Sequence, residues 1–422
     1  MSDSPLQLPP FKVLAATLRR TTERLAREVA DPTEAEPSWN EMEWAVARSA
    51  AAMQGISTLL ANGLAWAGPP AWLAFLAEQR EQSVLRDERI GSLLARIDAA
   101  MRERGVACVA LKGAALRSLD IYRPGERPMG DVDLLVASAD LPGVAAAMAD
   151  TDYVEAFTIK RHRVYEPRLK AAPRGFGEHV DNPLKIEIHT AIAEPLPVRS
   201  IDITEILQRG VMRPGLNHYP DLVSLLLHLL LHAAGNMRAH ALRHVQLHDI
   251  ALVASLLYEN DWHELLGQSG DRQRRWWLFP PLALAARYYP NHVPSEVLRA
   301  AKAACPRVLR LAAARQSLTD VSWSNLRIHA LPGLEWSRSP LDALRFLASR
   351  VAPTRRSLAQ IEAARRDQPQ LDGVPWYGVS HGSRLVRWLF SRPPRVQTIV
   401  SVRAALESVA VGATRPIDTW RR

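Results

Sequence analysis

Cysteine is almost absent from this chain of 422 residues, in which only Cys108 and Cys305 occur. Two cysteines exclude a disulfide framework and a cysteine-ligated zinc site, which fits a reducing compartment, and we expect a cytoplasmic protein. Lysine is also scarce and occurs only at positions 12, 112, 160, 170, 185 and 302. Arginine therefore carries nearly all of the positive charge, and each lysine is a rare choice for this chain.

Long hydrophobic runs are missing as well. The most apolar stretch, residues 222–234, contains His228 and His232 and is shorter than the roughly 20 residues that cross a bilayer. The first residues, MSDSPLQLPPF, lack the basic and then apolar pattern of a signal peptide. The sequence therefore predicts a soluble protein without a transmembrane segment. A hydrophobic fraction of 47% excludes general disorder.

The charge balance is basic, with a formal net charge of +9. Residues 384–422 hold eight arginines against Glu407 and Asp418, so much of the excess lies near the end of the chain. Basicity suits a phosphate-bearing substrate, and equally a nucleic acid or an anionic membrane surface. Within this tail, residues 383–390 alternate arginine with large apolar side chains. They are interpreted either as a surface-binding helix or as a peripheral helix packed on the body.

Hydrophobic periodicity divides the chain into four regions. Residues 1–90 read as an N-terminal helical region and residues 91–200 as an α/β core with strands near 106–111, 131–136, 153–159, 162–166 and 184–190. Residues 201–336 read as a helical domain closing a cleft, and residues 337–422 as a basic, Arg/Pro-rich C-terminal region. The predicted fold class is α+β, with a small mixed sheet flanked by helices and embedded between helical regions.

Residues 106–136, VACVALKGAALRSLDIYRPGERPMGDVDLLV, hold the strongest chemical signal. A short apolar strand ends at Lys112 and Gly113, where glycine permits a sharp turn or a close approach to a ligand. Because residues two apart on a strand face one side, Asp131 and Asp133 point together, with Val132 and Leu134 turned into the core. Paired carboxylates are typical of a cation site, although two solvated aspartates at the start of a strand give the same pattern.

The ordered combination of LKGAAL, a tyrosine and RPMGDVDLLV resembles the nucleotidyltransferase superfamily related to polymerase beta. More narrowly, it resembles the bacterial branch of largely uncharacterised nucleotidyltransferases, over roughly residues 90–260. The resemblance implies that Lys112, Gly113, Ala114 and Arg127 contact the triphosphate of an NTP, with ATP the preferred donor. It also implies that Asp131 and Asp133 bind two Mg²⁺ ions, for which Mn²⁺ is a possible substitute.

A second stretch, LKIEIHT at residues 184–190, places Lys185, Glu187 and His189 on one face of a strand. In the resembled family an aspartate two residues before a histidine completes the acidic triad, and this chain has Glu187 there. The resemblance therefore implies Glu187 as the third metal ligand or as the general base. Two alternatives remain open, namely an edge strand with a solvated polar face and a metal ligand from the nearby Glu178 or Asp181.

Two histidine pairs lie four residues apart, His228 with His232 and His244 with His248. This spacing suits a transition metal, but histidines on a leucine-rich helix are more often structural. LHLLLHAAG followed by LHDIALV also resembles the helical domain of the family, which implies that His232 and Asp249 face the nucleotide.

The sequence thus predicts a metal-dependent enzyme that moves a nucleoside monophosphate, AMP by family habit, from an NTP to an acceptor. The acceptor is a small molecule, a peptide or a protein, and a nucleic acid is not excluded. The alternative is a degenerate, non-catalytic member of the fold that binds nucleotide or nucleic acid.

Overall fold

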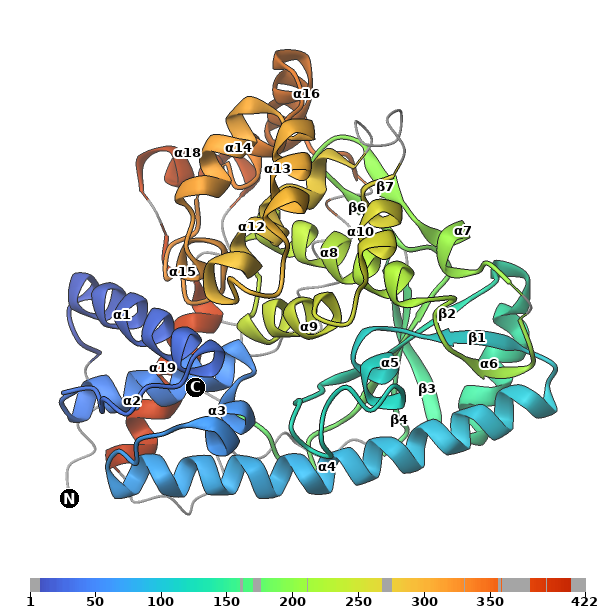
Figure 1. Ribbon diagram of the computed structural model, residues 1–422, viewed down its shortest axis with the longest axis horizontal. Helices are drawn as coiled ribbons and strands as arrows, with labels where there is room; N and C mark the ends of the chain where they lie inside the picture. Colours follow the sequence, from blue (N-terminus) through green and yellow to red (C-terminus); the bar gives the residue numbers. More distant parts are fainter. Residues whose placement is uncertain are drawn as a thin grey trace.

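The computed structural model describes residues 8–159, 162–169, 176–210, 212–267, 275–329, 331–355, 358, 380–391 and 393–410. Its centre is a mixed sheet of six strands in the order β3-β4-β5-β2-β1-β8 (Figure 1). The strands are β1 (Ala107–Ala110), β2 (Asp131–Val136), β3 (Tyr153–Ile159), β4 (His162–Pro167), β5 (Lys185–His189) and β8 (Gly215–Asn217). Helices from both ends of the chain surround the sheet, so the predicted α+β class is confirmed.

One face of the sheet is covered by α4 (Pro70–Glu103) and α6 (Leu141–Asp150). Helix α4 begins with a proline in its first turn, where no backbone N–H is lost, and the chain leaves it through Gly105 with φ +67°. A buried stripe that includes Ile90, Ile97 and Met101 packs on the strands. In Figure 1 this one long helix runs along the bottom of the molecule, from the N-terminal helices to the sheet.

The opposite face of the sheet meets α5 (Lys112–Ser118) and α8 (Leu222–Ala239). Val109 and Leu135 from the strands lie in one apolar cluster with the leucines of α8. Val132 and Leu134 lie in the cluster beneath α4 and α6. The period of two predicted for 131–136 is thus confirmed, and Asp131 and Asp133 belong to the face that looks toward α8.

The region after the sheet is mainly helical. Its elements are α7 (Thr204–Leu207), α9 (His244–Ala254), α10 (Glu259–Leu266), α12 (Phe279–Tyr288), α13 (Ser295–Ala304), α14 (Arg307–Arg315) and α15 (Leu318–Val321), with 3₁₀ turns at Ser138–Asp140, Trp276–Leu278 and Leu334–Trp336. Among the described residues, only Leu222–Ala239 is long and apolar enough to span a membrane, and 72% of it is buried inside the protein. That burial is typical of a core helix.

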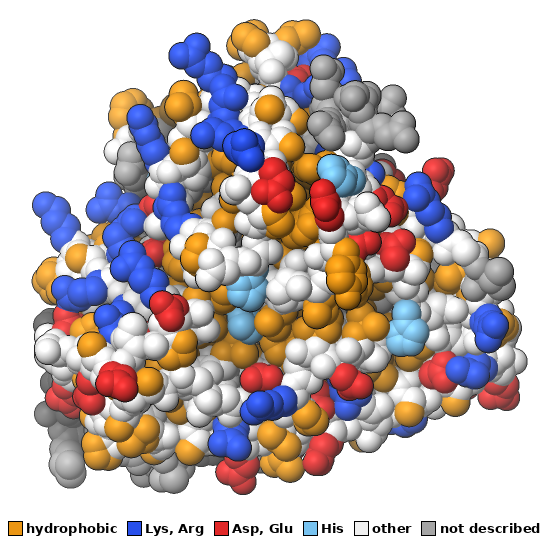
Figure 2. Space-filling view, viewed as in Figure 1, with side chains coloured by type: hydrophobic (Ala, Val, Ile, Leu, Met, Phe, Trp, Pro, Cys, Tyr) orange, Lys and Arg blue, Asp and Glu red, His pale blue; other side chains and the backbone are white. Residues whose placement is uncertain are grey.

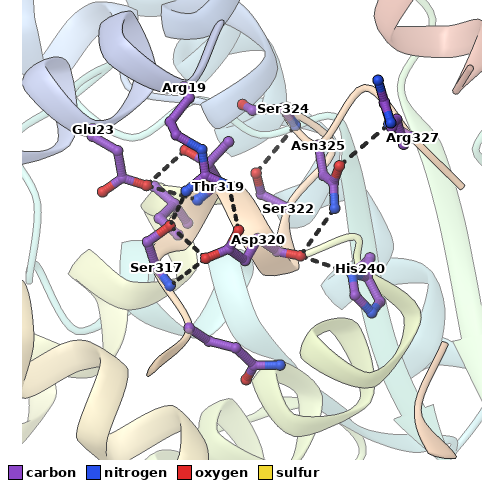
Figure 3. A network of polar contacts seen from close by, with 12 residues as sticks. Arg19, Glu23, His240, Ser317, Thr319, Asp320, Ser322, Ser324, Asn325 and Arg327 are labelled. Atoms are coloured by element: carbon purple, nitrogen blue, oxygen red, sulfur yellow. Dashed lines mark hydrogen bonds and ion pairs between the residues drawn. The ribbon is translucent and has the colours of Figure 1, made fainter. Parts of the chain in front are cut away.

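The N-terminal helices α1 (Phe11–Ala30), α2 (Glu41–Gln54) and α3 (Ser57–Gly63) pack beside the end of α4, around a tryptophan cluster that includes Trp66 and Trp72. Helix α1 is also bound to the later helical region. Arg19 Nη2 donates to Asp320 Oδ1 over 2.5 Å, and Glu23 Oε1 accepts a hydrogen bond from the Thr319 amide over 2.9 Å (Figure 3). The first helix and residues 317–327 therefore form one contiguous body.

The C-terminal elements are α16 (Pro340–Val351), α18 (His381–Phe390) and α19 (Val396–Ala410), of which α19 packs against α2. In α18 the apolar side chains of Leu389 and Phe390 are exposed, whereas the ring of Trp388 lies against Arg350 of α16. Residues 411–422, with part of the basic tail, lie outside the described residues. Figure 2 shows basic side chains gathered on the left of the molecule, over α1 and the α13–α14 region.

Several boundaries differ from those predicted. Within the predicted N-terminal helical region, the chain is divided at Gly55, which adopts a left-handed conformation after α2. Helix α8 continues through Gly235 to Ala239, because its leucines are buried on several sides. The strands β6 (Ala193–Pro195), β7 (Ser200–Asp202) and β8 were not predicted. Each has only three residues, too few for a period of two to be recognised.

Candidate functional site

The polar face of β2 continues onto the neighbouring strand β5. These strands pair in parallel, with Asp131 opposite Lys185, Asp133 opposite Glu187 and Leu135 opposite His189. Because paired residues of adjacent strands project to the same side, both aspartates and Glu187 lie on the face toward α8. This contact between residues distant in sequence assembles three carboxylates on one surface.

Asp133 is the most enclosed of the three, with 5% of its surface exposed. It accepts hydrogen bonds at Oδ1 from Lys112 Nζ over 3.0 Å and from His189 Nε2 over 2.8 Å. Burial disfavours its charge, but Lys112 and His189 outweigh that effect and hold the pKa of Asp133 well below its usual range. Asp133 is therefore an ionised carboxylate at neutral pH.

Asp131 stands at the solvent-accessible start of β2. Partial loss of water and then the charge of Asp133 raise the pKa of Asp131, while Lys112, Arg243 and Arg127 oppose that increase. The two aspartates therefore repel one another, and the charges of three cationic side chains act on Asp131. Such a setting favours a bound cation between the carboxylates and bound anions beside the cationic groups.

Glu187 has its carboxylate within the electric field of both aspartates. Burial, followed by the charges of Asp133 and Asp131, raises the pKa of Glu187 to about 8. The alternative ligands have other contacts: Glu178 pairs with Arg86 over 3.3 Å, and the amide of Asp181 donates to His179 Nδ1 over 3.1 Å. Glu187 is the carboxylate in register with Asp133.

Lys112 begins α5 with φ +45°, a left-handed conformation that is uncommon for residues other than glycine. Its amide donates to Tyr219 Oη over 3.2 Å, and Tyr219 is in turn hydrogen-bonded to His228 Nδ1 over 2.6 Å. Burial opposes the charge of Lys112, but Asp133 and Asp131 prevail and raise the pKa of its ammonium group. The strained turn thus holds a charged ammonium group directly against the carboxylate of Asp133.

Neighbouring side chains leave no room for a Cβ atom at Gly113. A Cβ at this position would lie 2.4 Å from Met129 Sδ and 2.5 Å from Arg127 Nη1. The amide of Ala114 already donates to the Leu111 carbonyl over 3.1 Å. These contacts show why glycine stands at the turn, and the predicted contacts of Gly113 and Ala114 with phosphate stay predictions.

Arg127 and Asp249, both predicted to contact nucleotide, bind each other. Arg127 donates from Nε to Asp249 Oδ1 and from Nη2 to Oδ2, each over 2.7 Å, and Tyr122 Oη donates to Oδ1 over 2.7 Å. Asp249 is 1% exposed. The pair joins the loop before β2 to α9, so it fixes the helical region against the sheet. Their predicted role toward nucleotide is not tested by this geometry.

The histidines of both predicted pairs form hydrogen bonds with protein side chains. His244 Nε2 and His248 Nδ1 both contact Tyr289 Oη, over 2.8 and 3.0 Å, as expected for structural histidines. His232 contacts Asn236 over 3.1 Å. Burial, and then the charge of Lys112, lowers the pKa of His232.

Arg243 is a candidate residue that the sequence does not single out. It immediately precedes α9. Arginine is abundant throughout the chain, so no sequence motif distinguishes this arginine from the others. Its charge acts on Asp131, Glu178 and His232. Arg243 therefore brings a cation to the site from the helical region, whereas Lys112 brings one from the sheet.

Two recesses lie near this site, and the aspartates line neither of them. One, of about 80 Å³, is lined by residues that include Gly113, Arg127 and Met129. The other, of about 660 Å³, is lined by residues that include Tyr122, Arg123 and His248. Neither lining contains Asp131, Asp133 or Glu187. The smaller recess adjoins Arg127, and the larger one is lined by Tyr122, which donates to Asp249.

Oxygen ligands of the kind that Mg²⁺ prefers are present in the three carboxylates. Burial, and then the charges of Asp133 and Asp131, raise the pKa of Glu187, so a bound cation would favour ionisation of all three carboxylates together. The donor set of Asp131, Asp133 and Glu187 therefore fits a divalent metal. A tighter group with metal-ligand spacing is formed by His162, Glu187 and His189, whose ligand atoms lie within 4.8 Å of one another.

Comparison with known proteins supports the family resemblance. No curated protein and no solved structure matches the chain. The sequence model of a protein family described as "Uncharacterised nucleotidyltransferase" matches residues 40–291, more than half of the chain. The matched region includes the whole sheet, the three carboxylates, Lys112 and Arg243. The chain belongs to this uncharacterised nucleotidyltransferase family.

Proposed function

We propose that this nucleotidyltransferase transfers a nucleoside monophosphate, AMP, from an NTP to an acceptor hydroxyl group with the help of Mg²⁺. One observation carries the proposal: Asp131, Asp133 and Glu187 share a face of two paired strands, where Lys112 contacts Asp133 and the charges of Lys112, Arg243 and Arg127 act on Asp131. Carboxylates suit metal ions, and these cations suit the phosphates of an NTP.

In this proposal the chain's own residues bind the substrates and position the reacting groups. Asp131, Asp133 and Glu187 would hold Mg²⁺, which would supply Lewis acidity toward the phosphates and the acceptor oxygen. Lys112 from the sheet and Arg243 from the helical region neutralise phosphate charge. The acceptor oxygen forms a bond to the α-phosphorus as the bond to the departing pyrophosphate breaks.

Glu187 is suited to remove the acceptor's proton. A general base works best when its pKa lies near the working pH, and the protein surroundings raise the pKa of Glu187 to about 8. A cation bound beside Glu187 would favour its ionised carboxylate. Glu187 would then be ionised at neutral pH and could either ligate the metal or accept the acceptor's proton as the general base.

The test measures two properties of the full-length protein. Calorimetry with α,β-methylene-ATP reports nucleotide binding with and without Mg²⁺, and pyrophosphate release from ATP reports chemistry in the presence of a cell extract as acceptor source. We expect Asp131→Asn to abolish pyrophosphate release and Lys112→Ala to weaken nucleotide binding. Asp152→Asn, a change at an exposed carboxylate, is the matched control and keeps wild-type values.

Binding without pyrophosphate release in any extract would favour the non-catalytic alternative. Equal pyrophosphate release by wild type and Asp131→Asn would overturn the assignment of the carboxylate site. Parallel assays with GTP, CTP and UTP determine the base preference.

A further inference from the structure

The two histidines beside Glu187 form a ligand group that magnesium chemistry does not require. His162 on β4 and His189 on β5 are directly opposite one another in an antiparallel pair, with ring centroids 5.0 Å apart. Glu187 Oε2 lies 3.7 Å from Nε2 of each histidine. Two adjacent strands thus direct two imidazole nitrogens and one carboxylate oxygen toward a common point.

The spacing of these atoms is close to that of a bound ion. Ligand atoms about 2.0–2.2 Å from a zinc ion lie roughly 3.3 Å from one another in a tetrahedral site. The observed 3.7 Å separations therefore need a contraction of only a few tenths of an ångström. All three ligand atoms lie within 4.8 Å of one another.

The chemistry of the donors selects the kind of ion. Mg²⁺ takes oxygen ligands almost exclusively, whereas imidazole suits Zn²⁺, Fe²⁺, Co²⁺ and Ni²⁺. A donor set of two histidines and one carboxylate with open positions is typical of such transition metals. The three carboxylates alone would have no such preference.

We propose that His162, Glu187 and His189 bind a transition-metal ion of the Zn²⁺ or Fe²⁺ class beside the Asp131–Asp133 pair. The proposal deepens the proposed function, because Glu187 belongs to both ligand sets, but the histidine site itself needs no nucleotide. The two ions then differ in kind: an oxygen-ligated Mg²⁺ at the aspartates and a nitrogen-ligated ion at the edge of β4 and β5. His189 Nε2 donates to Asp133 Oδ1 over 2.8 Å. Metal binding at Nε2 would replace this hydrogen bond, with the imidazole proton carried on Nδ1 instead.

The experiment uses Co²⁺ as a spectroscopic substitute for Zn²⁺ in the metal-free, full-length protein. We expect one equivalent of Co²⁺ to give a visible ligand-field spectrum that Zn²⁺ abolishes and that excess Mg²⁺ leaves unchanged. His162→Gln should weaken Co²⁺ binding at least about tenfold. His263→Gln alters a histidine whose side chain is 65% exposed, and this control should bind Co²⁺ like the wild type.

Asp131→Asn separates this proposal from the proposed function. It should retain the Co²⁺ spectrum and lose Mg²⁺-dependent nucleotide binding, so either proposal can fail alone. Equal Co²⁺ affinities of His162→Gln and wild type would overturn the histidine site, as would full displacement of Co²⁺ by Mg²⁺. Circular dichroism and a second variant, His189→Gln, show whether lost binding accompanies lost folding. Loss in both folded variants supports the site, and retention in both refutes it.

Discussion

Replacement of Asp249 by asparagine tests the contact that joins the helical region to the sheet. In the wild type, Arg127 is held by two hydrogen bonds of 2.7 Å from its guanidinium to the two carboxylate oxygens. Only 1% of Asp249 is exposed, and the side chain of Arg127 is 13% exposed. Asparagine keeps the size of the side chain but leaves the guanidinium as a largely buried and uncompensated charge.

The magnitude follows from this burial. Removal of one partner from a buried ion pair costs about 3–5 kcal/mol of unfolding free energy. Arg117 and Asp87 form a similar two-bond contact, at 3.0 and 3.2 Å, in which the arginine side chain is 37% exposed. Asp87→Asn is therefore the matched control and should cost about 1 kcal/mol or less.

Urea denaturation followed by circular dichroism measures both variants against the wild type. The double variant Arg127→Met/Asp249→Leu should recover most of the loss, because no unpaired charge stays buried. An Asp249→Asn variant as stable as Asp87→Asn would refute the reasoning. If Asp249→Asn left stability intact but weakened nucleotide binding, the pair would act on the substrate rather than on the fold.

Three further predictions concern the site and the buried histidines. Gly113→Val places side-chain atoms where Arg127 and Met129 already lie, so denaturation should show a loss of about 1–3 kcal/mol, and an unchanged stability would contradict this account of the glycine. Glu187→Gln should slow pyrophosphate release by about two to four orders of magnitude, whereas Glu187→Asp should retain substantial activity; equal rates for Gln and wild type would exclude the base. Burial, and then the charge of His248, lowers the pKa of His244 to about 3. Below pH 6.5 this histidine is therefore protonated in the unfolded chain but stays neutral in the folded chain. As the pH falls from 6.5 to 5, His244 should lower the unfolding free energy of the wild type by about 2 kcal/mol. Urea denaturation of His244→Gln at the same two pH values should not show this contribution.

Much of the site could be predicted from the sequence, because its strongest signals are local. Period-two alternation is a property of one strand, and it sufficed to put Asp131 and Asp133 on one face and Val132 and Leu134 on the other. The strands at 153–159, 162–167 and 185–189 carried the same kind of signal. The family motif joined these local features, and the family match confirmed it.

The tertiary structure decided which distant residues meet. Glu187 could be proposed from its own strand, but only the parallel pairing of β5 with β2 sets it beside Asp133. The binding of Arg127 to Asp249 and the position of Arg243 depend on how α9 packs on the sheet. No local period encodes such contacts, because they result from burying the apolar faces of whole elements together.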